Sequence, residues 1–279
     1  MGSEHRDQDK NRPRPARPAA KPSPQANLVA GPQEAPAGAQ RLNKAIAASG
    51  LCSRRKADAL ILAGRVCVNG QPEPNPGRQV GPEDTLSVDG RPLAAPQNYA
   101  YVLLHKPVQV VCTAHDPQGR PTVLDCLPEQ WRDLRLYPVG RLDYFSEGLL
   151  LLTNDGALAQ RLCHPSHHQP KSYEVLVRGT VPPEALETMR RGMHLAEGEK
   201  LAPVTVTAAP HPKGMLLQME LHQGLNRQIR RMCRDLGLTI LRLRRVAQGP
   251  LRLGDLPSGA ARELTPDEVT ALRRSVGLA

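Results

Sequence analysis

The chain centres on Val139-Gly140-Arg141-Leu142-Asp143-Tyr144-Phe145-Ser146-Glu147-Gly148, which runs into four leucines, Leu149 to Leu152, and then Asn154-Asp155-Gly156. Four leucines in a row are typical of a buried strand, and Asn-Asp-Gly is typical of a turn whose residues tolerate positive φ. A buried strand holds the loop before it rigidly, as a catalytic acid requires. Two interpretations of Asp143 stay open here: a catalytic carboxylate, or an acid that caps a turn or pairs with Arg141.

The composition favours a nucleic-acid partner without a broad stacking surface. The 279 residues are 39% hydrophobic, enough for two packed domains. The formal net charge of +10 suits a polyanion such as RNA or DNA, although many basic proteins bind neither. Aromatic residues are only 3% of the chain, so any base stacking must fall to a few individual rings.

The cysteines and the apolar runs argue against disulfides, metals and membranes. None of the six cysteines forms a C-x-x-C pair, and they are interpreted as small buried hydrophobic residues in a reducing compartment. Cys163-His164 with His167 and His168 resembles a metal cluster, but Pro165 and the lack of a second cysteine pair argue against one. With no transmembrane-length run and no signal-peptide apolar region, we expect a cytoplasmic protein without a membrane partner.

The chain divides into three parts by composition. Residues 1–39 are rich in Pro, Ala and Arg without periodicity, which predicts a disordered tail. Residues 40–95 show helical spacing around Leu42, a second helix capped by Ser53, and short strands closed by the turns Asn69-Gly70 and Asp89-Gly90. A linker then leads to a larger domain at 99–279.

Polar and basic residues gather on or beside the two predicted helices of the first domain. The candidate RNA contacts are Arg41, Lys44, Ser53, Arg54, Arg55, Lys56 and Arg65. Phosphates can dock on such side chains and on a helix N-terminus, although most charge runs are solvated faces. The order Arg-Leu-Asn-Lys, Ser-Arg-Arg-Lys-Ala and Gly-Arg-Val-Cys-Val-Asn-Gly closely resembles the RNA-binding domain named after ribosomal small-subunit protein four. The resemblance implies binding of structured RNA.

From Tyr99 onward the pattern alternates many short strands with few helices. Strands are expected at 101–104, 108–113, 149–152, 171–177, 204–208, 215–221 and 240–246, and helices at 157–162, 183–193, 228–236 and from 264 onward. No regular βαβ alternation is present. The pattern therefore predicts an α+β fold, with a small helix-rich domain before a larger one built on a mixed, largely antiparallel sheet flanked by helices.

Three further motifs follow the first domain in order. They are Gly140-Arg141-Leu142-Asp143, Lys171-Ser172-Tyr173 and Asn226-Arg227-Gln228-Ile229-Arg230-Arg231-Met232. Taken singly, the tyrosine fits an ordinary strand and the arginines fit a solvated helix face. As an ordered set covering 41–269, and together with Lys106-Pro107 and Leu243-Arg244-Arg245-Val246, they resemble a pseudouridine synthase of the RsuA and RluB type.

The resemblance implies an isomerase that converts a uridine of ribosomal RNA into pseudouridine with no cofactor or metal. Asp143 would be the nucleophile, adding to the ribose, adding to the base or assisting elimination. Tyr173 would stack on the flipped uracil and could also transfer a proton, and Arg230 would pair with Asp143. Any paired uridine must leave its stack before it reacts.

The resemblance also implies contacts to the substrate. Arg141 would help to extrude the base, Leu243 would pack beneath the tyrosine, and Lys171 and Arg227 would bind the RNA. Large-subunit rRNA is the expected substrate, with small-subunit rRNA second, and we expect a monomer. The alternative from another class is a non-catalytic RNA-binding or ribosome-assembly factor, which leaves the order of the acid, the tyrosine and the arginine unexplained. A DNA-binding protein is disfavoured because no groove-reading motif is recognisable.

Three positions differ from the usual residues of the family. Gln109 stands where a glycine is usual, Gln223 stands where a glutamate is usual, and the β-branched residue that usually precedes Gly249 is missing. None of these positions touches the inferred nucleophile.

Overall fold

The computed structural model describes residues 38–95, 98–164, 166 and 169–278. Most of the predicted N-terminal tail, together with Pro165, His167 and His168 of the possible metal cluster, lies outside the described residues. Within them, no group of three His, Cys, Asp or Glu side chains could hold a metal ion. No helix in this part of the chain is long and apolar enough to cross a membrane.

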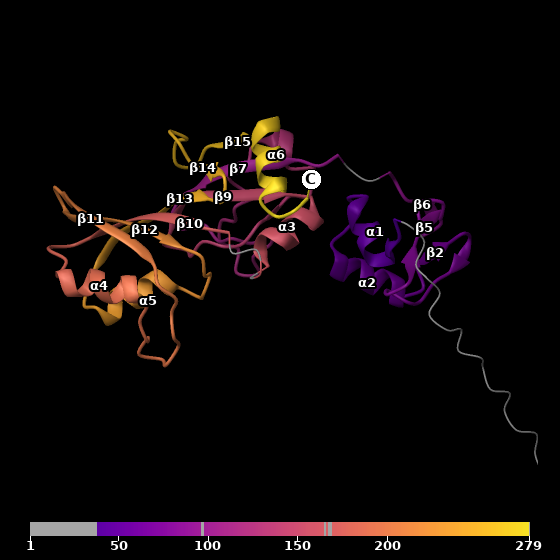
Figure 1. The fold of residues 1–279 in the computed structure, drawn as a ribbon. Helices are drawn as coiled ribbons and strands as arrows, with labels where there is room; N and C mark the ends of the chain where they lie inside the picture. The colour runs from indigo at the N-terminus through magenta and orange to yellow at the C-terminus, as the bar shows by residue number, and fades with distance from the viewer. Residues whose placement is uncertain (1–37, 96–97, 165, 167–168, 279) are drawn as a thin grey trace, which may run out of the picture.

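The first part of the chain is a small α+β unit (Figure 1). Its elements are β1 (Gln40–Arg41), α1 (Leu42–Ala48), α2 (Arg54–Leu62), β2 (Val66–Val68), β3 (Gln71–Pro72), β4 (Gln79–Val80), β5 (Leu86–Val88) and β6 (Arg91–Pro92). The Ser53 side chain caps α2 by accepting a hydrogen bond from the Lys56 amide, as predicted. Both residues of the turns Asn69-Gly70 and Asp89-Gly90 have positive φ, as the sequence predicts.

The larger part is built on a nine-stranded sheet with the order β11-β12-β10-β13-β9-β7-β15 and with β14 and β8 paired at its side. Its strands are β7 (Tyr101–Lys106), β8 (Tyr137–Pro138), β9 (Glu147–Thr153), β10 (Lys171–Val177), β11 (Thr205–His211), β12 (Gly214–Leu221), β13 (Ile240–Gln248), β14 (Leu251–Arg252) and β15 (Ala261–Glu263). Among the described residues its pairs are antiparallel except β13 with β9. The predicted α+β class with a mixed, largely antiparallel sheet is confirmed.

Helices pack against this sheet at both of its ends (Figure 1). They are η1 (Glu129–Trp131), α3 (Gly156–Cys163), α4 (Pro183–Arg191), α5 (Gln228–Asp235) and α6 (Pro266–Arg274). Residues of α4 and α5 share one core with β10, β12 and β13. Residues of α3 and α6 share another core with β7 and β9.

The four-leucine run explains why β9 lies in the middle of the larger domain. Leu149 and Leu151 belong to the core under α3 and α6, whereas Leu150 and Leu152 belong to the core on the other face. All four are fully buried. A strand buried on both faces needs a continuous apolar run, because alternate side chains point to opposite faces.

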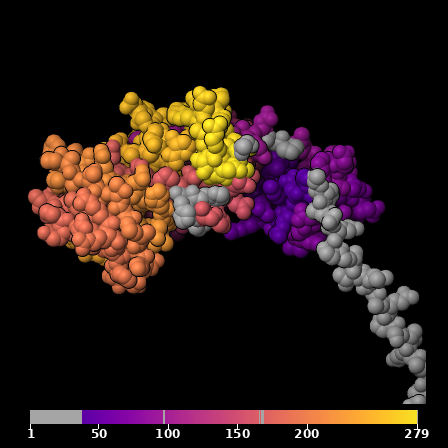
Figure 2. All heavy atoms as spheres, in the orientation of Figure 1, coloured from indigo at the N-terminus to yellow at the C-terminus, as the bar shows by residue number. Residues whose placement is uncertain are grey.

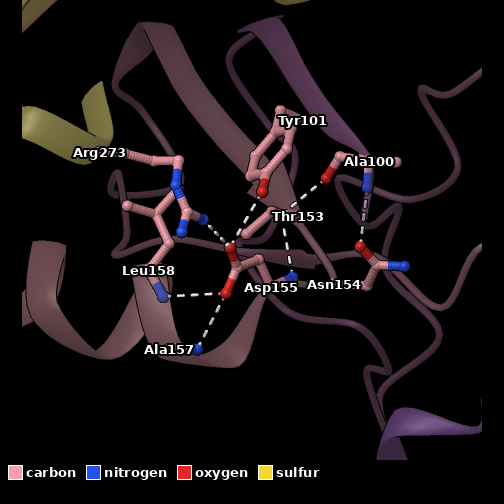
Figure 3. Close-up of polar contacts among 8 residues, drawn as sticks. All are labelled: Ala100, Tyr101, Thr153, Asn154, Asp155, Ala157, Leu158 and Arg273. Carbon is pink, nitrogen blue, oxygen red and sulfur yellow. Dashed lines mark hydrogen bonds and ion pairs between the residues drawn. The ribbon is translucent and has the colours of Figure 1, made fainter. Parts of the chain in front are cut away.

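The Asn154-Asp155-Gly156 segment does not form the predicted turn with positive φ. Asp155 instead caps α3, because its Oδ1 accepts hydrogen bonds from the amides of Ala157 and Leu158 (Figure 3). Its Oδ2 accepts from the Tyr101 hydroxyl at 2.9 Å and from Arg273 of α6 at 3.1 Å. Burial and this carboxylate raise the pKa of Tyr101 to about 12. The acid therefore joins β7, α3 and α6.

Two further expectations are wrong. Residues 108–113 form turns and one isolated bridge, Val111 to Thr122, instead of a strand. The reason is Gln109, whose φ of +63° interrupts extended backbone and turns its amide toward the Tyr144 carbonyl, 2.7 Å away. All six cysteines are free, but only Cys52 and Cys233 are buried, and Cys163 is exposed.

The small unit lies as a separate lobe at one end of the larger part (Figure 2). Arg135 joins the two, because its Nη1 donates to the carbonyls of Gly50 at 3.2 Å and Leu51 at 3.0 Å, just beyond α1.

Candidate active site

The turn that carries Asp143 is held by a buried lysine. Lys106, the last residue of β7, is fully buried, and its Nζ donates to the carbonyls of Pro107 at 2.9 Å, Asp143 at 3.2 Å and Ser146 at 2.8 Å. Burial lowers the pKa of Lys106 from its ordinary value. Three carbonyl acceptors match the three N–H groups of an ammonium, so the lysine clamps both ends of the turn.

The remaining carbonyls of this turn are bonded as well. The Gln109 amide donates to Tyr144 O, and Nη2 of Arg230 donates to Phe145 O, both at 2.7 Å. The Ser146 amide closes the turn on Asp143 O at 3.0 Å. Every carbonyl from Asp143 to Ser146 therefore has a donor, and the backbone that carries the acid is held at each residue.

Asp143 faces two arginines from the start of α5. Arg230 Nε lies 3.3 Å from Asp143 Oδ2, and Arg227 Nη1 lies 3.8 Å from the same oxygen. The Asp143 side chain is 27% exposed and that of Arg230 is 18% exposed, so the pair is partly screened from water. Nη2 of Arg230 also donates to Ser146 Oγ at 3.0 Å. The guanidinium thus contacts both the carboxylate and the turn that carries it.

Tyr173 and Leu243 approach the acid from the sheet. In the antiparallel pairing of β10 with β13, Val175 lies opposite Leu243 and Tyr173 lies opposite Arg245. Tyr173 and Leu243 are therefore diagonal neighbours on one face, and Tyr173 packs against the hydrophobic core that contains Leu243.

These side chains surround one cavity of about 90 Å³. Its walls come from the turn at 141–146, from Tyr173, from Leu243 and from the segment 221–230 that leads into α5. The cavity combines one carboxylate, three arginines and an aromatic ring, with apolar side chains around them. Such a site can hold a flat polar ring against Tyr173 while the carboxylate attacks it or its sugar.

A glycine lets the two halves of this site meet. Gly148, the second residue of β9, has a φ of +108°, and a Cβ at that position would lie 2.2 Å from the Arg245 carbonyl oxygen. Only a residue without a side chain lets β9 pair with β13 at this point. The pairing sets the Asp143 turn beside the strand that carries Leu243.

The structure brings together six of the residues that the sequence singled out: Arg141, Asp143, Tyr173, Arg227, Arg230 and Leu243. Lys171 does not line the cavity, and its Nζ donates to the Gln169 carbonyl at 3.0 Å. Burial and the neighbouring Arg245 lower the pKa of Lys171.

The seven residues of the first unit lie elsewhere, on an exposed surface. These are Arg41, Lys44, Ser53, Arg54, Arg55, Lys56 and Arg65. Two of the arginines have partners within the unit: Arg54 donates to Asn43 Oδ1, and Arg65 pairs with Asp89 at 2.6 Å.

Several polar residues at the site are not among the site residues that the sequence predicts, among them Lys106, Ser146 and Gln228. In the sequence Lys106 is marked only by the motif Lys106-Pro107, and its contact with Asp143 spans 37 residues of chain. Ser146 lines the cavity and accepts from Arg230. Gln228, the first residue of α5, also lines it and is 5% exposed, yet both of its amide atoms are unpaired within the described residues. An unpaired buried amide is costly, and no sequence pattern reveals it.

Comparison with known proteins agrees with this arrangement. A family model described as RNA pseudouridylate synthase matches residues 100–235, and an S4 domain model matches residues 40–86. An uncharacterized RNA pseudouridine synthase of Aquifex aeolicus is 40% identical, with 85% of this chain and 95% of that protein covered. Ribosomal large subunit pseudouridine synthase B of Bacillus subtilis is 41% identical, with 84% and 96% covered.

A solved structure supports the same assignment. A crystal structure of a pseudouridylate synthase is 27% identical with a TM-score of 0.59, and the match covers 83% of this chain and 99% of that one. The extended match to the two relatives and the ordered set of site motifs lead to one conclusion: the chain belongs to the RNA pseudouridylate synthase family.

Proposed function

We propose that this protein isomerises a uridine of ribosomal RNA to pseudouridine, with Asp143 as the nucleophile. The observation that carries the proposal is the Asp143 carboxylate itself, on a turn bonded at every carbonyl and 3.3 Å from Arg230 Nε, in the cavity that Tyr173 also lines. An enzyme needs an acid fixed in this way, whereas a protein that only binds RNA does not.

The reaction breaks the bond between uracil N1 and ribose C1′ and forms a bond from C5 to C1′. A half-turn of the base about its N3–C6 axis brings C5 to the place of N1. C5 then loses its proton and N1 gains one, so the atoms balance without an oxidant or a second substrate. Asp143 can act by adding to C1′, by adding to the base or by assisting elimination.

The other side chains of the cavity take supporting roles in this proposal. Tyr173 stacks on the uracil, with Leu243 packed beneath the ring, and its hydroxyl is available for proton transfer. Arg230 orients the carboxylate, because a guanidinium binds an acid and a carbonyl with fixed geometry. Arg141 and Arg227 contact the RNA strand as the base leaves its stack.

The proposed substrate is large-subunit rRNA. The Bacillus subtilis relative is named for the large subunit, and the S4 domain match covers residues with an exposed basic surface. We assign residues 40–95 to RNA binding, 99–279 to catalysis and 1–39 to a tail. The proposal further includes a monomeric enzyme that acts in the cytoplasm, where ribosomal RNA is found.

Mapping pseudouridine in rRNA from cells with and without the gene tests the substrate. Asp143→Asn tests the chemistry, because the amide has nearly the same size and is a far poorer nucleophile. We expect this variant to keep its fold and its RNA affinity and to lose tritium release from labelled uridine. Activity within about tenfold of wild type, a barrier change of only ~1.4 kcal/mol, would remove the assignment and favour the non-catalytic RNA-binding factor.

A further inference from the structure

One aromatic side chain on the turn that carries Asp143 is exposed and belongs to no hydrophobic core among the described residues. Phe145 is the only phenylalanine of the chain, and it is 58% exposed although it lies two residues after Asp143. Burying an aromatic side chain stabilises a fold, so a ring left in water contributes little here.

The ring is exposed on a turn that is held firmly. The carbonyl of Phe145 accepts from Arg230, and its neighbours Tyr144 and Ser146 are bonded through Gln109 and Lys106. Tyr144 meets the Phe145 ring edge to face, with centroids 5.0 Å apart and planes at 80°. An edge contact orients a ring and leaves a face available. Exposure here therefore reflects how the turn is built and not looseness of the backbone.

The charges around this turn suit a nucleic-acid strand. Arg227, half exposed at its side chain, and the exposed Arg141 flank Asp143. A groove with arginines and a presented aromatic ring is the usual means of holding a single strand, the arginines at phosphates and the ring against a base.

We propose that Phe145 is a stacking platform for the base next to the target uridine. When the uridine leaves its stack, its neighbour loses a stacking partner, and Phe145 replaces that partner at the edge of the cavity. The inference rests on the proposed function, since it takes the flipped uridine as given. It assigns a second ring to the RNA besides Tyr173, which contacts the flipped uridine itself.

The test uses a synthetic RNA that carries the mapped target uridine. Phe145→Leu keeps an apolar side chain without a π-face, and Phe145→Trp keeps the face. The matched control is Tyr99→Leu, because Tyr99 is 60% exposed and lies outside the turn at 141–146 that forms a wall of the cavity. Affinity is measured in the Asp143→Asn background, so that the result does not depend on turnover.

We expect Phe145→Leu to weaken binding by roughly five- to hundredfold, the range of stacking on one base, while Phe145→Trp and Tyr99→Leu bind as the parent does. Two further RNAs carry an abasic nucleotide, one in place of the base before the target uridine and one in place of the base after it. The loss of affinity should vanish on one of these two RNAs, the one that lacks the stacked base. Two results would overturn the inference. Phe145→Leu would bind as tightly as the parent, or it would show the same loss of affinity on both abasic RNAs. Failure of the proposed function has a different result: the wild type forms no pseudouridine in this RNA, whatever the Phe145 variants do to the affinity.

Discussion

At the scale of single residues, Arg230 links the Asp143 carboxylate to the turn that carries it. One guanidinium pairs with Asp143 through Nε and holds Phe145 O and Ser146 Oγ through Nη2. Burial lowers the pKa of Arg230, and Asp143 opposes that shift. Removing this side chain should disturb the position of the acid more than the affinity for RNA.

We expect Arg230→Ala to reduce single-turnover rates by about a hundredfold or more, because the acid drifts from its attacking position. Arg230→Lys should not restore the rate, since an ammonium lacks the planar fork by which the guanidinium contacts Asp143 through Nε and the turn through Nη2. Arg231→Ala is the control, because Arg231 pairs with Glu199 instead. A variant that binds RNA far more weakly but converts bound RNA at the normal rate would identify Arg230 as a phosphate contact.

Gln228 offers a test of function against stability. Within the part of the chain that the structure describes, its amide is buried without a partner. Gln228→Leu should therefore raise the free energy of unfolding by about 1–2 kcal/mol in urea titrations, and it should reduce activity if the amide meets the substrate. Gln223→Leu is the matched control, because Gln223 Oε1 accepts from the Ala202 amide at 3.0 Å and its loss should destabilise. Stability changes of the same sign in both variants would contradict this interpretation.

At the scale of elements, the site depends on one close approach between strands. Gly148→Ala would set a Cβ against the Arg245 backbone at a positive φ, so β9 and β13 must separate. We expect a loss of about 3 kcal/mol or more in thermal or urea unfolding. Gly179→Ala also has positive φ but meets nothing within 4 Å, so its loss should be smaller. Equal losses of stability in the two variants would show that the positive φ alone, and not the approach to Arg245, destabilises Gly148→Ala.

Elements with clear periodicity were predictable from the sequence, and irregular ones were not. The strand at 171–177 has its predicted bounds, and α5 ends within a residue of its prediction. The strands β8, β14 and β15 are two or three residues long, too short for any period to show. The positive φ of Gln109 is indicated only by the resemblance, in which a glycine is usual at this position, because a glutamine does not itself mark such a conformation.

The candidate site was predictable in part for a similar reason. Asp143, Tyr173 and Arg230 stand in short motifs whose order carries information. The clamp from Lys106 depends on a contact between distant segments, and the unpaired state of Gln228 depends on burial. Neither property can be read from neighbouring residues.

At the scale of the whole molecule, the two lobes present different surfaces to RNA. The larger lobe holds the cavity, and the smaller lobe carries exposed basic residues on α1 and α2. If binding and chemistry are divided in this way, a change in the smaller lobe should alter affinity and leave the chemical step unchanged.

Arg54→Ala combined with Arg55→Ala tests this division. Each phosphate contact that is lost should reduce the slope of log affinity against log salt by roughly 0.7 to 0.9, so the double variant should bind an rRNA fragment more weakly and with a flatter salt dependence. At saturating RNA it should convert uridine almost as fast as wild type. Arg190→Ala with Arg191→Ala removes the same charge from two exposed residues of α4 in the larger lobe and serves as the control. Titrations at three salt concentrations and single-turnover assays give both quantities. If the double variant and the control variant both keep the affinity and the salt slope of the wild type, Arg54 and Arg55 belong to a solvated face of α2. The role of Asp143 would be unaffected by that result.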